Sequence, residues 1–200
     1  MSLPAASGLY DPRYEHDACG VGFVAALNGQ PSHAIVRHGI QLLLTLVHRG
    51  ASGCDPLTGD GAGLLMQMPH AFFQKECEAL DLLLPPPGEY GVGFVFLPQH
   101  AEQRRRCEQI VEDKILATGQ RLIGWRDVPV DTNGLGKTVL ASMPVIRQAF
   151  IGRGANCADQ DAFERKLIVI RKQTQNPLAA LAEKHNLPGL TQLYMPSFSS

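Results

Sequence analysis

The sequence predicts a layered α+β fold, and two features of its pattern support this prediction. Expected strands and helices alternate over the first half of the chain, which is typical of stacked layers of helix and sheet. Over the second half, expected strands also follow one another without a helix between them, and this disfavours a purely parallel sheet. The 200 residues are 44% apolar and 18% charged, a composition typical of a folded chain rather than a disordered one.

The first half of the chain predicts two strands, two helices and one long loop. Short apolar runs predict the strands, and Ser32 and Pro69 are residues suited to the start of a helix. The loop contains five glycines, and long shaped loops in compact domains are usually functional. In chain order, the expected elements are a strand at 20–27, a turn at Asn28–Gly29, a helix at 33–47, the loop at 48–63, a strand at 62–68 and a helix at 69–80.

The second half of the chain predicts more strands than helices. A proline-rich connector at 85–88 precedes it, and Gly119 is suited to end a helix. The expected elements are a strand at 90–97, an amphipathic helix at 101–118, strands at 121–127, 139–142, 146–151 and 167–171, a helix at 177–185 and a strand at 190–198.

Charge and hydropathy exclude several classes of partner. The formal net charge is -1, so the sequence predicts no nucleic-acid partner and no anionic membrane surface. We interpret the basic run 104–106 as the solvated face of a helix. The strongest apolar run, at 42–47, is far shorter than the ~20 residues of a membrane-spanning helix. Residues 1–18 lack the apolar core of a secretory signal, so we expect a cytoplasmic protein.

The cysteines and histidines follow no metal-binding or disulfide pattern. Five cysteines are an odd number and include no Cys-x-x-Cys pair, which favours free thiols in a reducing compartment. The seven histidines are scattered and match no zinc motif. The sequence therefore predicts no metal site.

Cys19 is the first candidate for a catalytic group. Residues 1–18 are polar and predict a removable pro-segment, and a glycine-rich apolar run follows Cys19. A cysteine nucleophile needs a base, which is either a histidine from elsewhere in the fold or, at the first residue of a chain, the cysteine's own α-amino group. On local grounds a buried, inert cysteine at the start of a strand is an equally good interpretation.

A second group of candidates lies in the glycine-rich loop. Arg49, followed by Gly50, could favour the thiolate of a nearby cysteine, or could bind the last carbonyls of the preceding helix. Residues 55–63 include Asp60 and Gly61 and could line a ligand site, although an exposed connection explains them as well. The loop is neither a phosphate-binding loop nor a dinucleotide fingerprint, and its aspartates lack the other ligands of a metal site.

Two segments of the chain resemble each other. The run at 19–24, Cys-Gly-Val-Gly-Phe-Val, is similar to the run at 90–95, Tyr-Gly-Val-Gly-Phe-Val. Gene duplication is one explanation. Two buried strands that each need close backbone approach explain the similarity equally well.

Three motifs together resemble one known family. Residues 14–23, His48–Ala51 and 55–63 resemble the start of the large subunit in the glutamate synthase family. More broadly, they are similar to a type 2 glutamine amidotransferase domain, one of the N-terminal-nucleophile hydrolases. The similarity continues into residues 88–93, 124–129 and 163–167, so it covers nearly all of the chain after residue 18.

The resemblance implies a fold and a reaction. The fold would be a four-layer αββα sandwich over 19–200, incomplete at its C-terminus. Cys19 would be the nucleophile for hydrolysis of glutamine to glutamate and ammonia, with its freed α-amino group as the base. Arg49 would shape the surroundings of the nucleophile, and the loop with Gly50, Asp60 and Gly61 would line the same region.

The resemblance also implies partners beyond this segment. Ammonia would pass to a synthase domain in the remainder of the large subunit, which aminates 2-oxoglutarate. This segment would hold no cofactor. The full-length family member would carry FMN and an iron–sulfur cluster, and a small NADPH-oxidising subunit is a further expected partner.

The resemblance leaves out two parts of the family's site. In relatives, a later segment supplies an arginine for the glutamine carboxylate and an Asn-Gly pair for the oxyanion hole. Asn28–Gly29 lies too near Cys19 for that role, and Asn133–Gly134 lacks the family context. An oxyanion donor is worth about 10²–10³-fold in rate, so we expect little or no glutaminase activity from these 200 residues alone.

Three hypotheses therefore remain. The chain is the nucleophile-bearing piece of a glutamate synthase that is cut within a domain, a self-contained amidotransferase with another acceptor, or a non-catalytic interaction module that retains the fold.

Overall fold

Two units of different size make up the part of the chain that the computed structural model describes, which is residues 20–50, 58–59 and 61–200. The first unit comprises the described residues up to Met66, together with Gly134–Gly136. The second comprises Gln67–Asn133 and Lys137–Ser200. Each unit is considered by itself.

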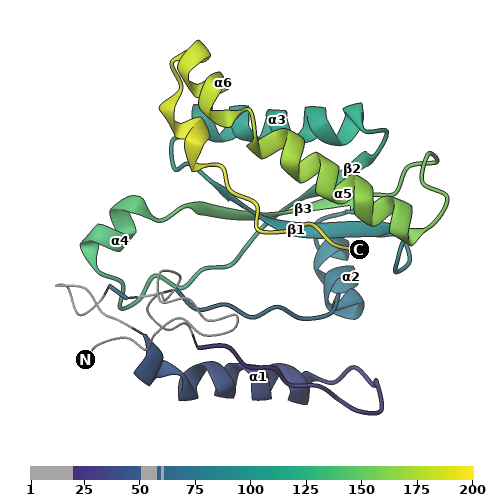
Figure 1. Ribbon diagram of the computed structural model, residues 1–200, viewed down its shortest axis with the longest axis vertical. Coiled ribbons are helices and arrows are strands. Elements are labelled where there is room, and N and C mark those ends of the chain that lie inside the picture. The colour runs from purple at the N-terminus through teal and green to yellow at the C-terminus, as the bar shows by residue number, and fades with distance from the viewer. Residues whose placement is uncertain (1–19, 51–57, 60) are drawn as a thin grey trace, which may run out of the picture. The chain divides into compact units, whose positions relative to one another are not determined.

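The first unit is built around α1, His33–Thr45 (Figure 1). The side chain of Ser32 accepts a hydrogen bond from the Ala34 amide, as predicted for the N-cap. The predicted turn before it is also confirmed: the Gly29 amide donates to the Ala26 carbonyl, and Gly29 has a φ of 67°, which favours glycine. A short 3-10 helix, η2, Val47–Arg49, follows α1.

The two strands predicted for the first unit are wrong. Residues 20–27 and 61–68 have no strand assignment, and in the described chain they form no ladder with each other. Val21, Phe23 and Leu65 are about nine-tenths exposed. An apolar run predicts a tendency to be buried, but a strand also requires a neighbour for its backbone groups, and the pattern of one segment does not reveal that neighbour.

The second unit contains a three-stranded antiparallel sheet. Its strands are β1, Tyr90–Leu97, β2, Arg121–Asp127, and β3, Val145–Gly152, in the spatial order β1-β3-β2. All three strands were predicted from their apolar runs. A bulge between Leu122 and Gly124 interrupts the pairing of β2 with β3.

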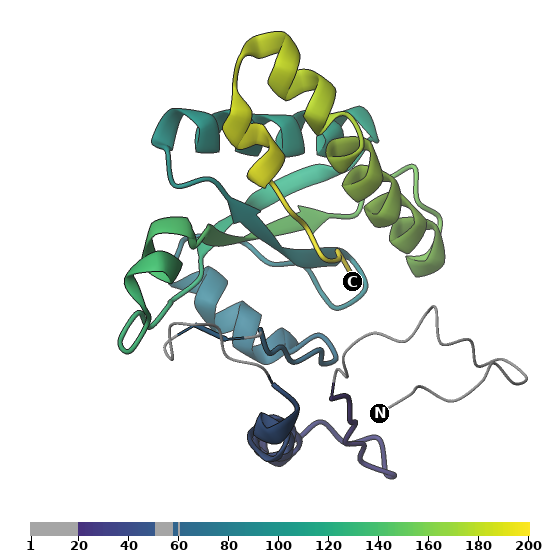
Figure 2. The same cartoon turned by 60° about the vertical axis from the view of Figure 1, so that its left-hand side comes forward.

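Helices cover both faces of this sheet (Figures 1 and 2). On one face lie α3, Ala101–Ala117, and α5, Gln160–Gln175, with α6, Leu178–His185, and the 3-10 helix η3, Pro188–Gln192, beyond them. On the other face lies α2, His70–Glu78. The helices predicted at 69–80, 101–118 and 177–185 are confirmed.

Two predicted strands of the second unit are helices instead. The run 167–171 lies within α5, where Phe163, Leu167 and Ile170 are buried at helical spacing while Ile168 is half exposed. The run 139–142 lies in α4, Lys137–Ser142. The side chain of Gln99 donates to the carbonyls of Leu140 and Met143, so contacts distant in sequence stabilise this short helix.

The last predicted strand, at 190–198, is also wrong. After η3 the chain runs beside the outer edge of β1 and pairs with it only at isolated positions, Tyr194 with Phe96 and Ser199 with Val92. A Cβ atom on Gly93 would overlap the Ser197 carbonyl oxygen and the Phe198 ring. This close approach explains a glycine in β1 without gene duplication.

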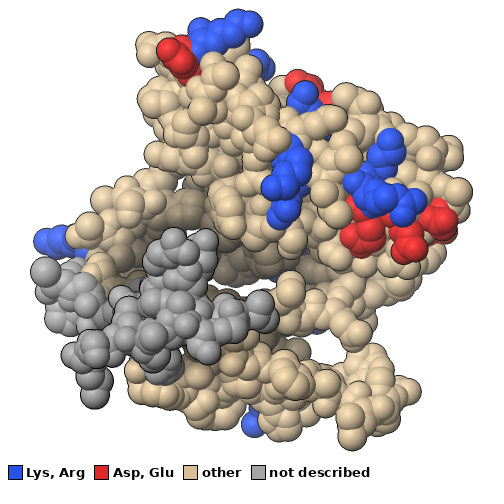
Figure 3. Space-filling view, viewed as in Figure 1, with Lys and Arg blue, Asp and Glu red and all other residues tan. Residues whose placement is uncertain are grey.

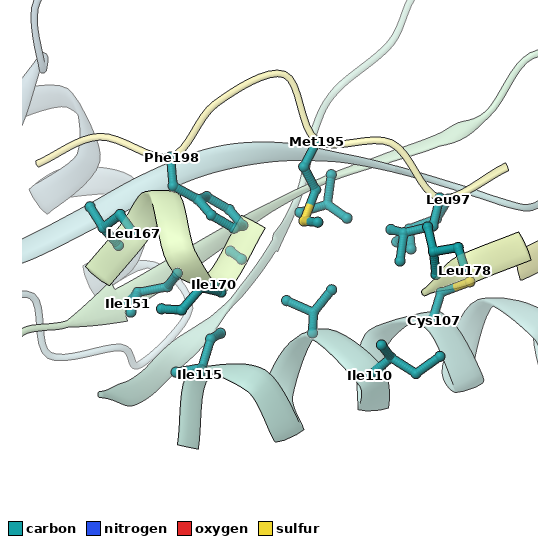
Figure 4. Close-up of a cluster of buried hydrophobic side chains, with 14 of the residues drawn as sticks. Leu97, Cys107, Ile110, Ile115, Ile151, Leu167, Ile170, Leu178, Met195 and Phe198 are labelled. Atoms are coloured by element: carbon teal, nitrogen blue, oxygen red, sulfur yellow. The ribbon is translucent and has the colours of Figure 1, made fainter. Parts of the chain in front are cut away.

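The apolar core of the second unit has one part on each face of the sheet. The larger part joins β1 and β3 to α3, α5 and the C-terminal segment; Figure 4 shows Cys107, Ile115, Leu167, Met195 and Phe198 in it. The smaller part lies under α2 and consists of Phe73, Cys77, Tyr90 and Phe150. Helices and an antiparallel sheet thus confirm an α+β arrangement, with one sheet rather than two in the described residues.

Charged side chains of both signs lie close together on the surface. On the face that Figure 3 draws, acidic and basic side chains lie side by side over α5 and α6. Among the described helices, none is both long and apolar enough to cross a membrane.

Candidate functional site

The chain that follows Cys19 lies against the end of α1. A Cβ atom on Gly20 would lie 2.9 Å from Leu46 Cδ2, and one on Gly22 would lie 2.6 Å from Leu42 Cδ1. Glycine therefore lets this segment approach the helix closely. Since Gly20 is bonded to Cys19, the approach brings the residue after the candidate nucleophile to the C-terminal turn of α1.

The same turn carries Arg49 and Gly50. At the end of α1, the Leu46 amide donates to the Leu43 carbonyl, and the Thr45 hydroxyl donates to the Leu42 carbonyl at 2.7 Å. The imidazole Nδ1 of His48 lies 2.9 Å from the Thr45 carbonyl oxygen. The backbone of Arg49 ends η2, and Gly50 leaves it in an extended conformation with a φ of -83°.

Gly61 lies in a segment that runs along another part of α1. In that segment, the side chain of Leu64 lies 2.7 Å from where a Cβ atom of Gly39 would be. No described atom lies within 4 Å of a Cβ built on Gly61. The structure thus brings Gly20 and the Arg49 turn to one end of α1, while Gly61 contacts neither of them in this way. Cys19 and Asp60 lie outside the described residues.

Gly50 and Gly61 do not need glycine for their backbone conformation. Neither residue has a positive φ, and a Cβ on Gly50 would meet its nearest described atom, the Val47 carbonyl oxygen, at an ordinary 3.5 Å. The expectation that the loop glycines make tight turns is therefore wrong at these two positions.

Three of the five cysteines are buried in the second unit. Cys77 and Cys107 are fully buried, and Cys157 is 6% exposed. Burial raises the pKa of the Cys77 thiol, and burial together with the Glu108 carboxylate raises the pKa of the Cys107 thiol to about 11. A thiol with a raised pKa is a poor nucleophile at neutral pH, so Cys77 and Cys107 are structural.

The polar clusters of the second unit hold elements together. Arg126 of β2 forms an ion pair with Glu76 of α2 and donates to Gln148 of β3 at 3.0 Å. On the opposite face, Arg147 binds Glu108 at 2.8 Å and lies over the Trp125 ring. Each of these guanidinium groups has its partners within the fold.

A cavity of about 410 Å³ lies where the strands of the second unit end. Its lining is mostly apolar, and its one charged residue, Asp127, already pairs with Arg147 at 2.6 Å. The lining residues are Gln99, Asp127, Val128, Val130, Met143, Pro144, Val145 and Ile146. Within the described ranges, no group of three or more histidine, cysteine or acidic side chains is arranged to hold a metal ion.

Comparison with known proteins identifies the family. The family model described as "Glutamine amidotransferases class-II" matches residues 19–200, and its match begins at Cys19. The chain belongs to the class-II glutamine amidotransferases. This family assignment confirms the resemblance that the His48–Ala51 and Cys19–Phe23 motifs indicated.

The matching relatives are large chains of glutamate synthase. The chain is 48% identical over 174 residues to "Glutamate synthase [NADPH] large chain" of Bacillus subtilis, a match that covers 87% of this chain and 11% of that protein. It is 41% identical over 182 residues to "Glutamate synthase [NADH]" of Schizosaccharomyces pombe, covering 88% and 8%. It is 35% identical over 176 residues to "Ferredoxin-dependent glutamate synthase 1, chloroplastic/mitochondrial" of Arabidopsis thaliana, covering 88% and 11%. This amidotransferase chain therefore spans about a tenth of the length of these relatives.

Proposed function

We propose that this amidotransferase chain supplies the glutamine-hydrolysing part of a glutamate synthase, with Cys19 as its nucleophile. The observation that carries the proposal is the approach of Gly20 to Leu46, which brings the segment after Cys19 to the helix end that continues into Arg49. The start of the family match at residue 19 supports the same assignment. Residues 1–18 are then a pro-segment, and their removal frees the α-amino group of Cys19.

The reaction needs one nucleophile and one base. The neutral α-amino group of Cys19 accepts the thiol proton, and the thiolate attacks the side-chain amide carbon of glutamine. The C–N bond breaks, the ammonium group returns the proton to the leaving nitrogen, and ammonia leaves a γ-glutamyl thioester. Water attacks the thioester while the amine accepts its proton, and glutamate and the free thiol result.

The described residues support a specific role for Arg49. A guanidinium near a thiol stabilises the thiolate and lowers the pKa of the thiol. Arg49 follows a turn whose backbone groups are hydrogen-bonded, so its starting direction is fixed by α1. Gly50, Asp60 and Gly61 then belong to the wall of the site, where a side chain at either glycine would take space from glutamine.

We propose the four-layer αββα sandwich of the family for the complete domain. The sheet face that carries α2 is covered at one end only, since Tyr90 is buried while Phe94, on the same face of β1, is 42% exposed. An uncovered aromatic side chain on a sheet face is suited to packing against a second sheet.

The partners of the whole protein follow from the same proposal. Ammonia passes to a synthase domain that aminates 2-oxoglutarate, in a cytoplasmic protein with an NADPH-oxidising small subunit as a further partner. FMN and an iron–sulfur cluster belong to other parts of that protein, since such clusters need several cysteine ligands and Cys77, Cys107 and Cys157 are buried on separate elements. No step of glutamine hydrolysis requires either group.

Glutamate release by the full-length protein tests the proposal. Cys19→Ser should abolish glutamine-dependent glutamate release, while Cys54→Ser, its matched control, should leave it largely intact. Mass analysis of the mature protein should show Cys19 as the first residue. A retained residue 18 in an active enzyme would overturn the free-amine mechanism, and robust turnover by the 200 residues alone would show that no later segment is needed.

A further inference from the structure

The end of α1 contains an imidazole that the proposed mechanism does not use. The Nδ1 atom of His48 lies 2.9 Å from the carbonyl oxygen of Thr45, the last residue of α1. The carbonyls of the last helical turn have no partner within the helix, and a basic side chain near the C-terminus can bind them. Because a carbonyl accepts, Nδ1 carries the proton, in either the neutral ring or the imidazolium.

This hydrogen bond closes a loop of four residues that ends beside Arg49. Within it, the Leu46 amide binds the Leu43 carbonyl, and the Gly50 amide binds the Val47 carbonyl at 3.1 Å. The imidazole adds a side-chain link from the middle of η2 back to the helix. The backbone direction from which the Arg49 side chain starts is therefore tied to α1 on both sides.

The tie matters because α1 also contacts the segment that follows Cys19. Gly20 and Gly22 lie against Leu46 and Leu42, one turn or less before His48. A change in the path of η2 relative to α1 thus changes the path of Arg49 relative to the chain after Cys19. Effects on a charge pair are steep, since the interaction depends on distance and on the polarity of the surroundings.

We propose that His48 is a positioning residue, which holds the turn that directs Arg49 toward the thiolate of Cys19. The inference rests on the proposed function, because it acts only through that pair. His48 itself does not touch glutamine in this scheme. Its contribution is the Nδ1 donor, so a side chain with a donor at the same place should replace it.

The apparent pKa of the Cys19 thiol in the mature full-length protein tests this role. It is obtained from the rate of iodoacetamide labelling of Cys19 between pH 5 and 9, measured on the isolated peptide by mass spectrometry. Arg49→Gln should raise this pKa by about one unit, a tenfold loss of thiolate well below the pKa. His48→Ala should produce part of that shift, about threefold in labelling rate at pH 6.

Two further variants separate positioning from general damage. His48→Asn keeps an N–H donor close to the position of Nδ1 and should restore the wild-type labelling profile. The double variant His48→Ala/Arg49→Gln should be no worse than Arg49→Gln, because His48 acts through Arg49. His38→Ala, which removes a histidine from the middle of α1, is the matched control and should leave the profile unchanged.

The outcomes distinguish this inference from the proposed function. If Arg49→Gln shifts the thiol pKa but His48→Ala does not, His48 has no positioning role and the proposed function stands. If Arg49→Gln has no effect on Cys19, the charge pair itself is refuted. If His48→Asn is as impaired as His48→Ala at equal thermal stability, the Nδ1 donor is not what matters and the inference is overturned.

Discussion

Gly20 lies so close to Leu46 that a Cβ atom would be 2.9 Å from the leucine Cδ2 atom. The relationship joins two parts of the proposed site that are far apart in sequence. One is the chain after Cys19, and the other is the helix end that leads to Arg49. Glycine at this position is thus a requirement of packing against α1.

We predict that Gly22→Ala destabilises the first unit. Its new methyl group would lie 2.6 Å from Leu42 Cδ1, so the leucine must move, and overpacking of this kind costs about 1–3 kcal/mol. Urea unfolding measures the loss. Adding Leu42→Val to Gly22→Ala should recover part of it, because valine lacks the overlapping carbon.

Gly63→Ala is the matched control for this experiment. Gly63 has no positive φ and no described atom within 4 Å of a built Cβ, so its substitution should change stability by less than about 0.5 kcal/mol. Equal losses for Gly22→Ala and Gly63→Ala would show that the approach to Leu42 is not the cause.

We predict that Gly93→Ala releases the C-terminal segment from β1. A methyl group there would overlap the Ser197 carbonyl and the Phe198 ring, and backbone yields less readily than a side-chain end. The Ser199 and Tyr194 amides donate to Val92 and Phe96 of β1, so hydrogen exchange at these two amides should accelerate. Unchanged protection at Ser199 would contradict the prediction.

The sheet could be predicted from the sequence because its strands carry their own signals. β1 and β2 have the predicted ends, since each is a short apolar run bounded by glycine, proline or polar residues. Their order β1-β3-β2 could not be predicted, because it depends on pairing between distant segments. The run 167–171 was misjudged because its β-branched residues favour a strand locally, whereas Asp159 caps a longer helix with a buried face.

The candidate site was predictable in its residue types but not in its geometry. A cysteine before a glycine-rich run, an arginine after a helix and the family's motif spacing indicated Cys19 and Arg49. The contact of Gly20 with Leu46 could not be foreseen, because glycine has no side chain whose pattern reveals a partner. The role of His48 was missed as well; a histidine three residues after the last helical residue is a weak signal of a C-cap.

We predict that Glu76→Gln destabilises the second unit by about 2 kcal/mol. The Arg126 side chain is 9% exposed, and it binds Glu76 and Gln148 while lying 5.5 Å from the centre of the Phe72 ring. Removing the carboxylate charge leaves a nearly buried cation without its counterion. The loss is smaller than for a fully buried pair, because Glu76 is one-third exposed.

Glu89→Gln is the matched control for this ion pair. Glu89 and Arg153 are 3.8 Å apart and the Glu89 side chain is half exposed, so the change should cost less than about 0.5 kcal/mol. Chemical unfolding of both variants in the same buffer compares them. Similar effects for Glu76 and Glu89 would mean that burial of Arg126 contributes little.

The buried thiol of Cys107 should make the protein less stable in alkaline solution. Its pKa in the folded protein is about 11, against an ordinary value of 9.0, because burial and Glu108 disfavour the thiolate. Between these values the unfolded chain loses the proton while the folded chain keeps it. The free energy of unfolding therefore falls as the pH rises from about 9, and at pH 11 this thiol alone should account for a loss of about 2 kcal/mol.

Comparison with Cys107→Ala isolates this contribution from those of other groups. Tyr90, whose pKa burial raises to about 12, and Cys77 add losses of the same sign, but both are present in the variant. Cys107→Ala should be less stable at pH 7 because it leaves a cavity in the core between α3 and the sheet. Its stability should then decline less between pH 9 and 11 than that of the wild type. Parallel stability curves for the two proteins over this range would show that Cys107 does not keep its proton in the folded state.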